Sequence, residues 1–184
     1  MTLNEIRRSK GYWTDKGAEP DHGNAGHDYL VTYEMILPQY KQADIILEIG
    51  VGCGGSMYLW RDYFERARII GLETNSGSLL RGEDRIMTLL GSGTDPAFTD
   101  TLHWVFDVII DDGSHRLEDQ RKSLQLLWPK LKKGGLYCIE DVLPDYVAML
   151  EQDMRALNPD RILKADSSMG RPGDSILLMA FKRA

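Results

Sequence analysis

The chain has 184 residues, enough for one domain, and its 42% apolar and 27% charged residues are ordinary for a globular protein. A net charge of −6 without a basic stripe argues against a nucleic-acid backbone or an anionic membrane surface as the main partner. No apolar run approaches the roughly 18 residues of a spanning helix, and the N-terminus lacks the apolar region of a signal peptide. We therefore expect a cytoplasmic protein with two free thiols, Cys53 and Cys138. A homo-oligomer is compatible with the sequence.

The first 27 residues are rich in glycine and are expected to form a loop, without a strand or a long helix. A helix is predicted over residues 29–37, stopped by Pro38. From residue 45 onward, apolar strand and helix patterns alternate. Strands are predicted over 45–49, 67–72, 85–89, 105–110, 136–139, 161–165 and 175–181. Helices are predicted over 57–64, 96–102, 117–131 and 145–157.

Short apolar strands separated by helices predict an α/β fold, with a mostly parallel seven-stranded sheet and helices on both faces. In such sheets, ligands bind beyond the carboxyl ends of the strands. We interpret residues 1–40 as an N-terminal lid or acceptor segment, and residues 41–184 as the main domain. The loops after the first, second, fourth and fifth predicted strands are the expected places for a site.

A glycine-rich loop follows the first predicted strand. Gly50, Gly52 and Gly55 have the G-x-G-x-x-G spacing, which permits a tight turn and close approach of a ligand to the backbone. Glu73 ends the second predicted strand, where a carboxylate can accept hydrogen bonds from both hydroxyls of a ribose. The combination favours a nucleoside cofactor, and the alternative is a purely structural glycine turn.

Glu48, two residues before the first glycine, indicates which nucleoside cofactor the loop binds. A carboxylate is poorly placed beside a pyrophosphate because like charges repel. It suits S-adenosylmethionine, which carries an ammonium and a sulfonium and no phosphate. The alternative interpretation is a solvated charge at the end of a strand.

The stretch Leu-Glu-Ile-Gly-Val-Gly-Cys-Gly-Gly at residues 47–55 closely resembles the glycine-rich motif of class I methyltransferases, whose fold is Rossmann-like. The resemblance implies that the glycine loop lines the methionine part of the cofactor and that Glu73 holds its ribose. In that family the residues after the third strand usually contact adenine, often through an acid, and Ser92 stands in the place of that acid here. The predicted cofactor-binding set is Thr14, Lys16, Glu48, Gly50, Gly52, Gly54, Gly55, Ser56, Glu73, Ser92 and Asp111.

A second group of polar residues follows the fourth and fifth predicted strands. Asp112 and His115 follow the fourth, and Glu140 and Asp141 end the fifth. In a class I methyltransferase sheet these strands are neighbours, so their tips would lie about 5 Å apart. Clustered acids repel one another unless a proton or a cation intervenes, and oxygen ligands favour Mg²⁺. The alternative is a helix cap beside a solvated acidic loop.

The pattern Asp-Asp-Gly-Ser-His at 111–115 with a later Glu-Asp, together with Trp-Thr-Asp-Lys-Gly at 13–17, resembles metal-dependent sugar O-methyltransferases of the macrocin and mycinamicin type. Residues 27–29 and 33–34 share in the resemblance, which covers about residues 11–145. It implies that Asp112, Glu140 and Asp141 bind Mg²⁺, that His115 is the catalytic base, and that residues 14–17 lie over cofactor or acceptor. The predicted reaction is O-methylation of a sugar-type hydroxyl on a small-molecule natural product, as in antibiotic biosynthesis.

Three other functions remain open from the sequence. A catechol-type O-methyltransferase would share the fold and the metal but act on a planar diol. An NAD-dependent dehydrogenase would use the glycine loop for a dinucleotide, against which Glu48 argues. A non-catalytic cofactor-binding subunit would not need Asp112, His115, Glu140 and Asp141.

Overall fold

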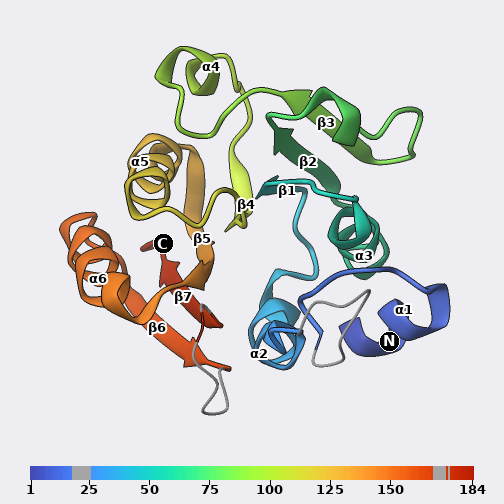
Figure 1. Ribbon diagram of the computed structural model, residues 1–184, viewed down its shortest axis with the longest axis horizontal. Coiled ribbons are helices and arrows are strands. Elements are labelled where there is room, and N and C mark those ends of the chain that lie inside the picture. Colours follow the sequence, from blue (N-terminus) through green and yellow to red (C-terminus); the bar gives the residue numbers. More distant parts are fainter. Residues whose placement is uncertain (18–25, 168–172, 174) are drawn as a thin grey trace.

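A computed structural model describes residues 1–17, 26–167, 173 and 175–184 (Figure 1). The strands form one seven-stranded sheet in the order β3-β2-β1-β4-β5-β7-β6. Neighbouring strands from β3 to β5 are parallel, and β7 is antiparallel to both β5 and β6. The predicted, mostly parallel sheet is confirmed. The strands are β1 Ile45–Ile49, β2 Arg68–Glu73, β3 Ile86–Leu90, β4 Phe106–Asp111, β5 Leu131–Val142, β6 Arg161–Asp166 and β7 Ile176–Phe181.

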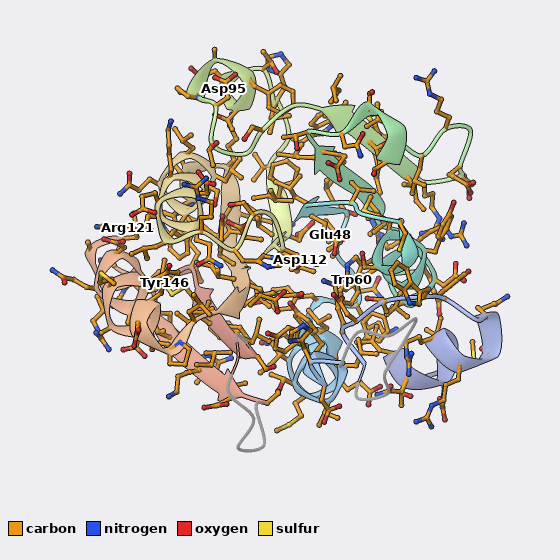
Figure 2. The ribbon with its side chains drawn as sticks, viewed as in Figure 1. Glu48, Trp60, Asp95, Asp112, Arg121 and Tyr146 are labelled. Carbon is orange, nitrogen blue, oxygen red and sulfur yellow. The ribbon has the colours of Figure 1, made fainter. Side chains whose placement is uncertain are left out.

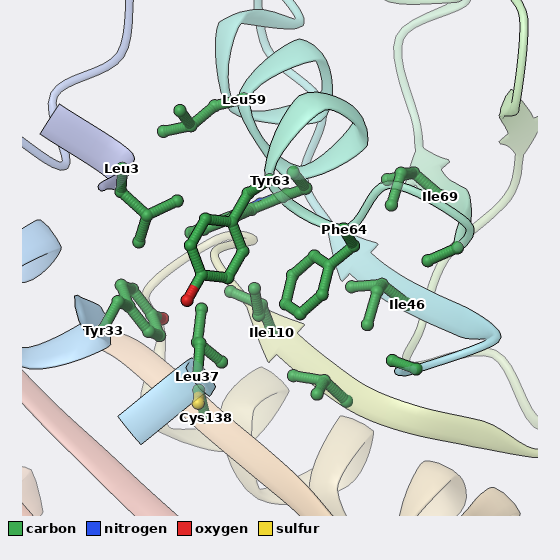
Figure 3. Close-up of a cluster of buried hydrophobic side chains, with 14 of the residues drawn as sticks. Leu3, Tyr33, Leu37, Ile46, Leu59, Tyr63, Phe64, Ile69, Ile110 and Cys138 are labelled. Carbon is green, nitrogen blue, oxygen red and sulfur yellow. The ribbon is translucent and has the colours of Figure 1, made fainter. Parts of the chain in front are cut away.

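Helices cover both faces of this sheet because successive strand residues point to opposite sides. In Figure 1, α5 and α6 lie to the left of the sheet, and α1 and α3 lie to its right. Ile46 packs in the core under α1, α2 and α3, which Figure 3 shows in close-up, whereas its neighbour Leu47 packs under α5 and α6. The helices are α1 Leu3–Lys10, α2 Tyr29–Ile36, α3 Gly55–Tyr63, α4 Pro96–Asp100, α5 Leu117–Leu127 and α6 Val147–Ala156. Within the described residues, no helix has the length and apolar character needed to cross a membrane.

The expectation that residues 1–27 form only a loop is wrong for α1. Thr2 and Glu5 form a capping box, in which Thr2 Oγ1 accepts from the Glu5 N–H at 3.1 Å and Glu5 Oε2 accepts from the Thr2 N–H at 2.8 Å. Leu3 and Ile6 are buried in the core beside α3, so tertiary packing stabilises an eight-residue helix. Residues 18–25 of this segment, including His22, lie outside the described residues.

Strand β5 is longer than predicted at both ends. Residues 131–135 were expected to end the preceding helix, but α5 ends at Leu127 and a short 3₁₀ turn containing Pro129 leads into the strand. At its other end, the pairing of β5 with β7 shifts register between Ile139 and Val142. Such a bulge re-aims the residues inside it, which here are Glu140 and Asp141.

Candidate functional site

The glycine loop joins β1 to α3 and lets separate segments of the chain pack together. The Gly50 N–H donates to the Leu72 carbonyl at 2.9 Å, and a Cβ on Gly50 would lie 2.8 Å from the Asp112 carbonyl carbon. A Cβ on Gly55 would overlap the Trp13 backbone. At these two positions, glycine is required by neighbouring backbone of this same chain. The loop therefore brings β4 and the N-terminal segment against the end of β1.

A cavity of about 550 Å³ lies at the carboxyl ends of β1, β2 and β4, where parallel sheets bind ligands. Most predicted cofactor-binding residues line it, namely Thr14, Gly50, Gly52, Gly55, Ser56, Glu73, Ser92 and Asp111. Asp112 and His115 line the same cavity. Lys16 and Glu48 are instead buried, and neither they nor Gly54 line it.

Glu73 is held in place at the end of β2 by backbone N–H groups. Its Oε2 accepts from Val51 and Gly52 at 3.1 and 3.2 Å, and its Oε1 accepts from Thr74 and Asn75, each at 2.8 Å. Burial alone would raise the pKa of Glu73, but these hydrogen bonds lower it below its usual range. The cavity thus has a fixed, ionised carboxylate beside the glycine loop.

Ser92 and Asp111 contribute hydroxyl and carboxyl groups to two other walls. The Ser92 hydroxyl lies 2.8 Å from the Thr94 hydroxyl, and both residues line the cavity. Burial raises the pKa of Asp111 to about 7, although the hydrogen bond from the Ser123 hydroxyl opposes this shift. The wall after β3 therefore offers hydroxyl groups where the family resemblance would have an acid.

The strand ends bring Asp112, His115 and Asp141 together. His115 Nε2 lies 3.2 Å from Asp112 Oδ1 and 3.4 Å from Asp141 Oδ2, and one ligand atom from each residue lies within 4.8 Å of the others. His115 and Asp141 have φ of 59° and 52°, in the left-handed region that non-glycine residues seldom adopt. Such backbone conformations concentrate at functional sites. These three side chains could ligate a metal ion.

Glu140 is buried and pairs with Lys16, which is buried too. The Lys16 Nζ lies 2.5 Å from Glu140 Oε2, 2.5 Å from Asp112 Oδ2 and 3.4 Å from Glu48 Oε1. Figure 2 shows Asp112 and Glu48 at the centre of the molecule. The structure thus places Lys16, predicted beside the cofactor, among the acids behind the cavity wall. It also gives the predicted ligand Glu140 an ammonium partner.

Two tyrosines of α2 were not among the predicted site residues. The Tyr29 hydroxyl donates to Asp141 Oδ1 at 2.8 Å, and the Tyr33 hydroxyl donates to Glu140 Oε1 at 2.5 Å. Their i, i+4 spacing places both on one face of the helix, so each reaches one of two consecutive acids. That spacing, together with the place of both tyrosines in the family resemblance, was the available signal. His27 also approaches this group, with Nδ1 3.5 Å from Asp141 Oδ1.

Burial and mutual repulsion decide the protonation of the four acids. Burial raises the pKa of Glu48 to about 7 and the pKa of Glu140 well above its usual range, although Lys16 opposes both shifts. Burial also raises the pKa of Asp141, with the Asp112 charge adding to it. Asp112 behaves differently, because Lys16 and His115 outweigh burial and lower its pKa. Glu48, Glu140 and Asp141 are therefore each stabilised by a proton or by a nearby cation.

The strand order, with an antiparallel β7 between β5 and β6, is the class I methyltransferase fold. The solved structure of MycE methyltransferase from the mycinamycin biosynthetic pathway, in complex with Mg and SAH, aligns with a TM-score of 0.77 and 26% identity. The alignment covers 100% of this chain and 55% of that chain. No family model matches the chain.

The chain is homologous to macrocin- and mycinamicin-type sugar O-methyltransferases. It is 36% identical over 131 residues to demethylmacrocin O-methyltransferase of Streptomyces fradiae. It is 40% identical over 131 residues to 8-demethyl-8-(2-methoxy-alpha-L-rhamnosyl)-tetracenomycin-C 3'-O-methyltransferase of Streptomyces olivaceus. Each match covers 65% of this chain and 33% of the relative, so the chain corresponds to about a third of those proteins.

Proposed function

We propose that this chain transfers the methyl group of S-adenosylmethionine to a sugar-type hydroxyl of a small-molecule natural product, assisted by Mg²⁺. The observation that carries the proposal is the meeting of Asp112 and His115, which line the cavity with the glycine loop and Glu73, with Asp141 next to them. The Streptomyces olivaceus relative is named as an O-methyltransferase of a rhamnosyl-tetracenomycin, which supports a sugar-type acceptor.

The cavity of about 550 Å³ has the volume of an ordinary ligand pocket, and its carboxylates suit the cationic S-adenosylmethionine. Glu73 presents an ionised carboxylate suited to ribose hydroxyls, and its four backbone hydrogen bonds keep it in place. The open space at Gly52 leaves the loop accessible to a ligand, because among the described residues only Gly52 and its two chain neighbours come within 4 Å of an added Cβ. The acids at the far wall favour a positively charged methyl donor over a dinucleotide phosphate.

The donor atoms of the acidic cluster fit Mg²⁺, which prefers carboxylate oxygens. We propose Asp112, Glu140 and Asp141 as the ligands, as the family resemblance implies. His115, which the geometry groups with Asp112 and Asp141, is assigned to proton transfer instead. A bound Mg²⁺ would supply Lewis acidity, lowering the pKa of an acceptor hydroxyl and fixing its orientation. Tyr29 and Tyr33 keep their hydroxyls on Asp141 and Glu140, which orients both carboxylates.

His115 is the proposed general base. Its Nε2 lies at the cavity wall beside Asp112, and its side chain is 36% exposed, so an acceptor can reach it. The new bond joins the acceptor oxygen to the methyl carbon, and the carbon–sulfur bond breaks to leave a neutral thioether. His115 Nε2 takes the hydroxyl proton, so the charge of the sulfonium ends on the imidazole. Asp112 and Asp141 beside the ring stabilise that imidazolium.

The test combines binding with turnover. Calorimetry with S-adenosylhomocysteine and with NAD separates a methyltransferase from a dehydrogenase, and we expect heat only with the former. Methylation is then measured on rhamnosylated and macrocin-type acceptors and on a catechol panel, with Mg²⁺ and after chelation. We expect sugar methylation that chelation abolishes and Mg²⁺ restores.

Each rival function has its own outcome in this test. Turnover on catechols alone would show that the acceptor is a catechol rather than a sugar-type hydroxyl. Binding of S-adenosylhomocysteine without any turnover on either panel would support a non-catalytic subunit. Full activity after exhaustive chelation would rule out a role for Mg²⁺ in the reaction.

A further inference from the structure

Lys16 has an unusual position for a lysine, because its side chain is only 1% exposed and ends among three carboxylates. Its Nζ lies 2.5 Å from an oxygen of Asp112, 2.5 Å from an oxygen of Glu140 and 3.4 Å from an oxygen of Glu48, so Lys16 is a buried ammonium paired with carboxylates. It supplies positive charge to the acidic cluster of Glu48, Asp112, Glu140 and Asp141.

The oxygens that Lys16 contacts belong to two of the proposed metal ligands. Both oxygens of Glu140 already have partners, Oε2 with Lys16 at 2.5 Å and Oε1 with Tyr33 at 2.5 Å. On Asp112, Oδ2 contacts Lys16 at 2.5 Å and Oδ1 faces His115 at 3.2 Å. Lys16 therefore holds one oxygen of each carboxylate. A divalent cation that binds Asp112 and Glu140, even through their other oxygens, lies close to the Lys16 ammonium, and the two cations repel each other.

Lys16 also belongs to the strip of chain along the cavity. Trp13, Thr14 and Asp15 line the cavity, and the Lys16 carbonyl accepts from the Leu30 N–H at 3.0 Å. The neighbouring Asp15 carbonyl accepts from the His27 N–H at 2.8 Å. The ion pairs of Lys16 thus tie this strip to the ends of β4 and β5.

We propose that Lys16 is a built-in counter-cation that competes with a divalent metal ion for Asp112 and Glu140. Its competition weakens metal binding and couples metal occupancy to the position of residues 13–17. This inference rests on the proposed metal site, and it assigns Lys16 a positioning role that the proposed function does not require.

The test measures Mn²⁺ binding by calorimetry, without cofactor or acceptor, in Lys16→Met and Lys16→Arg. Removing a positive charge this close to a divalent ion should lower the Kd of Lys16→Met at least about tenfold. Lys16→Arg keeps the charge and should stay much closer to the unmodified protein. Lys133→Met, at an exposed site, changes the net charge equally and should leave the Kd within about twofold.

A second measurement uses the unmodified protein, so it does not depend on how well a variant folds. Residue-resolved amide exchange is followed with and without saturating Mg²⁺. Release of Lys16 from its acids should speed exchange at the His27 and Leu30 amides, which are bonded to the Asp15 and Lys16 carbonyls.

The outcomes separate this inference from the proposed function. If the unmodified protein binds Mn²⁺ and Lys16→Met binds it equally or more weakly, the competition is refuted while the metal site stands. Should Lys16→Met not fold, unchanged amide exchange at both positions overturns the inference. Absence of Mn²⁺ binding in the unmodified protein overturns the metal site and the inference together.

Discussion

Replacing Gly50 with alanine tests whether the glycine loop positions the end of β4. Gly50 has φ of 88°, and an added Cβ would lie 2.8 Å from the Asp112 carbonyl carbon and closer still to its oxygen. Gly52 is the matched control. It also has a positive φ, of 53°, but an added Cβ would meet no described residue within 4 Å apart from Gly52 itself and its two chain neighbours.

The two variants separate backbone strain from steric overlap. Alanine in the left-handed region costs about 1 kcal/mol, which is the whole expected loss for Gly52→Ala. Gly50→Ala adds overpacking against backbone that belongs to the end of β4, worth about 2 kcal/mol more. We therefore expect the free energy of unfolding to fall by about 1 kcal/mol in Gly52→Ala and by about 3 kcal/mol in Gly50→Ala.

Urea denaturation of both variants, without ligand, measures these differences. Mn²⁺ calorimetry then asks whether the displaced Asp112 still binds metal, and we expect a weaker affinity only in Gly50→Ala. Equal unfolding free energies for the two variants, within about 0.5 kcal/mol, would refute the role given to the Gly50–Asp112 contact.

Three further predictions follow from other contacts. Burial alone would raise the pKa of Asp107, but Lys132 and the Ile45 and Asp44 N–H groups lower it. The ionised Asp107 carboxylate therefore stabilises the fold fully above the ordinary pKa of about 3.9, and this stabilisation is lost as the pH falls through the lowered pKa. Asp107→Asn should therefore reduce the unfolding free energy by about 1–2 kcal/mol at pH 7 and by much less near pH 2; an equal loss at both values would contradict this cause. His115→Ala should abolish turnover while the Kd values for S-adenosylhomocysteine and Mn²⁺ stay within about threefold, and loss of Mn²⁺ binding would make His115 a ligand rather than the base. Glu73→Gln should raise the Kd for S-adenosylhomocysteine about tenfold or more in calorimetry, because hydrogen bonds to a charged acceptor are the stronger ones, and an unchanged Kd would remove Glu73 from the ribose site.

The sequence by itself determined the class of fold and the ends of the strands that matter. Alternating apolar runs and helical patterns predicted the strands that the structure has, usually within one or two residues, because burial on both faces demands continuous apolar runs. The glycine spacing and Glu73 located the cavity, since turn chemistry and strand ends are local features. The Thr2–Glu5 capping box was also readable, and the glycine content around it obscured α1.

Only the tertiary structure decided how the acids are partnered. Lys16 is 96 residues from Asp112 and 124 residues from Glu140 in sequence, and no local pattern predicts that its ammonium lies between them. The tyrosines that hold Glu140 and Asp141 come from a helix that packs across the sheet. The bulge that directs Glu140 to Lys16 and Asp141 to His115 arises from the pairing of β5 with β7. Periodicity records which residues are buried, whereas the packing of distant segments decides which buried charges meet.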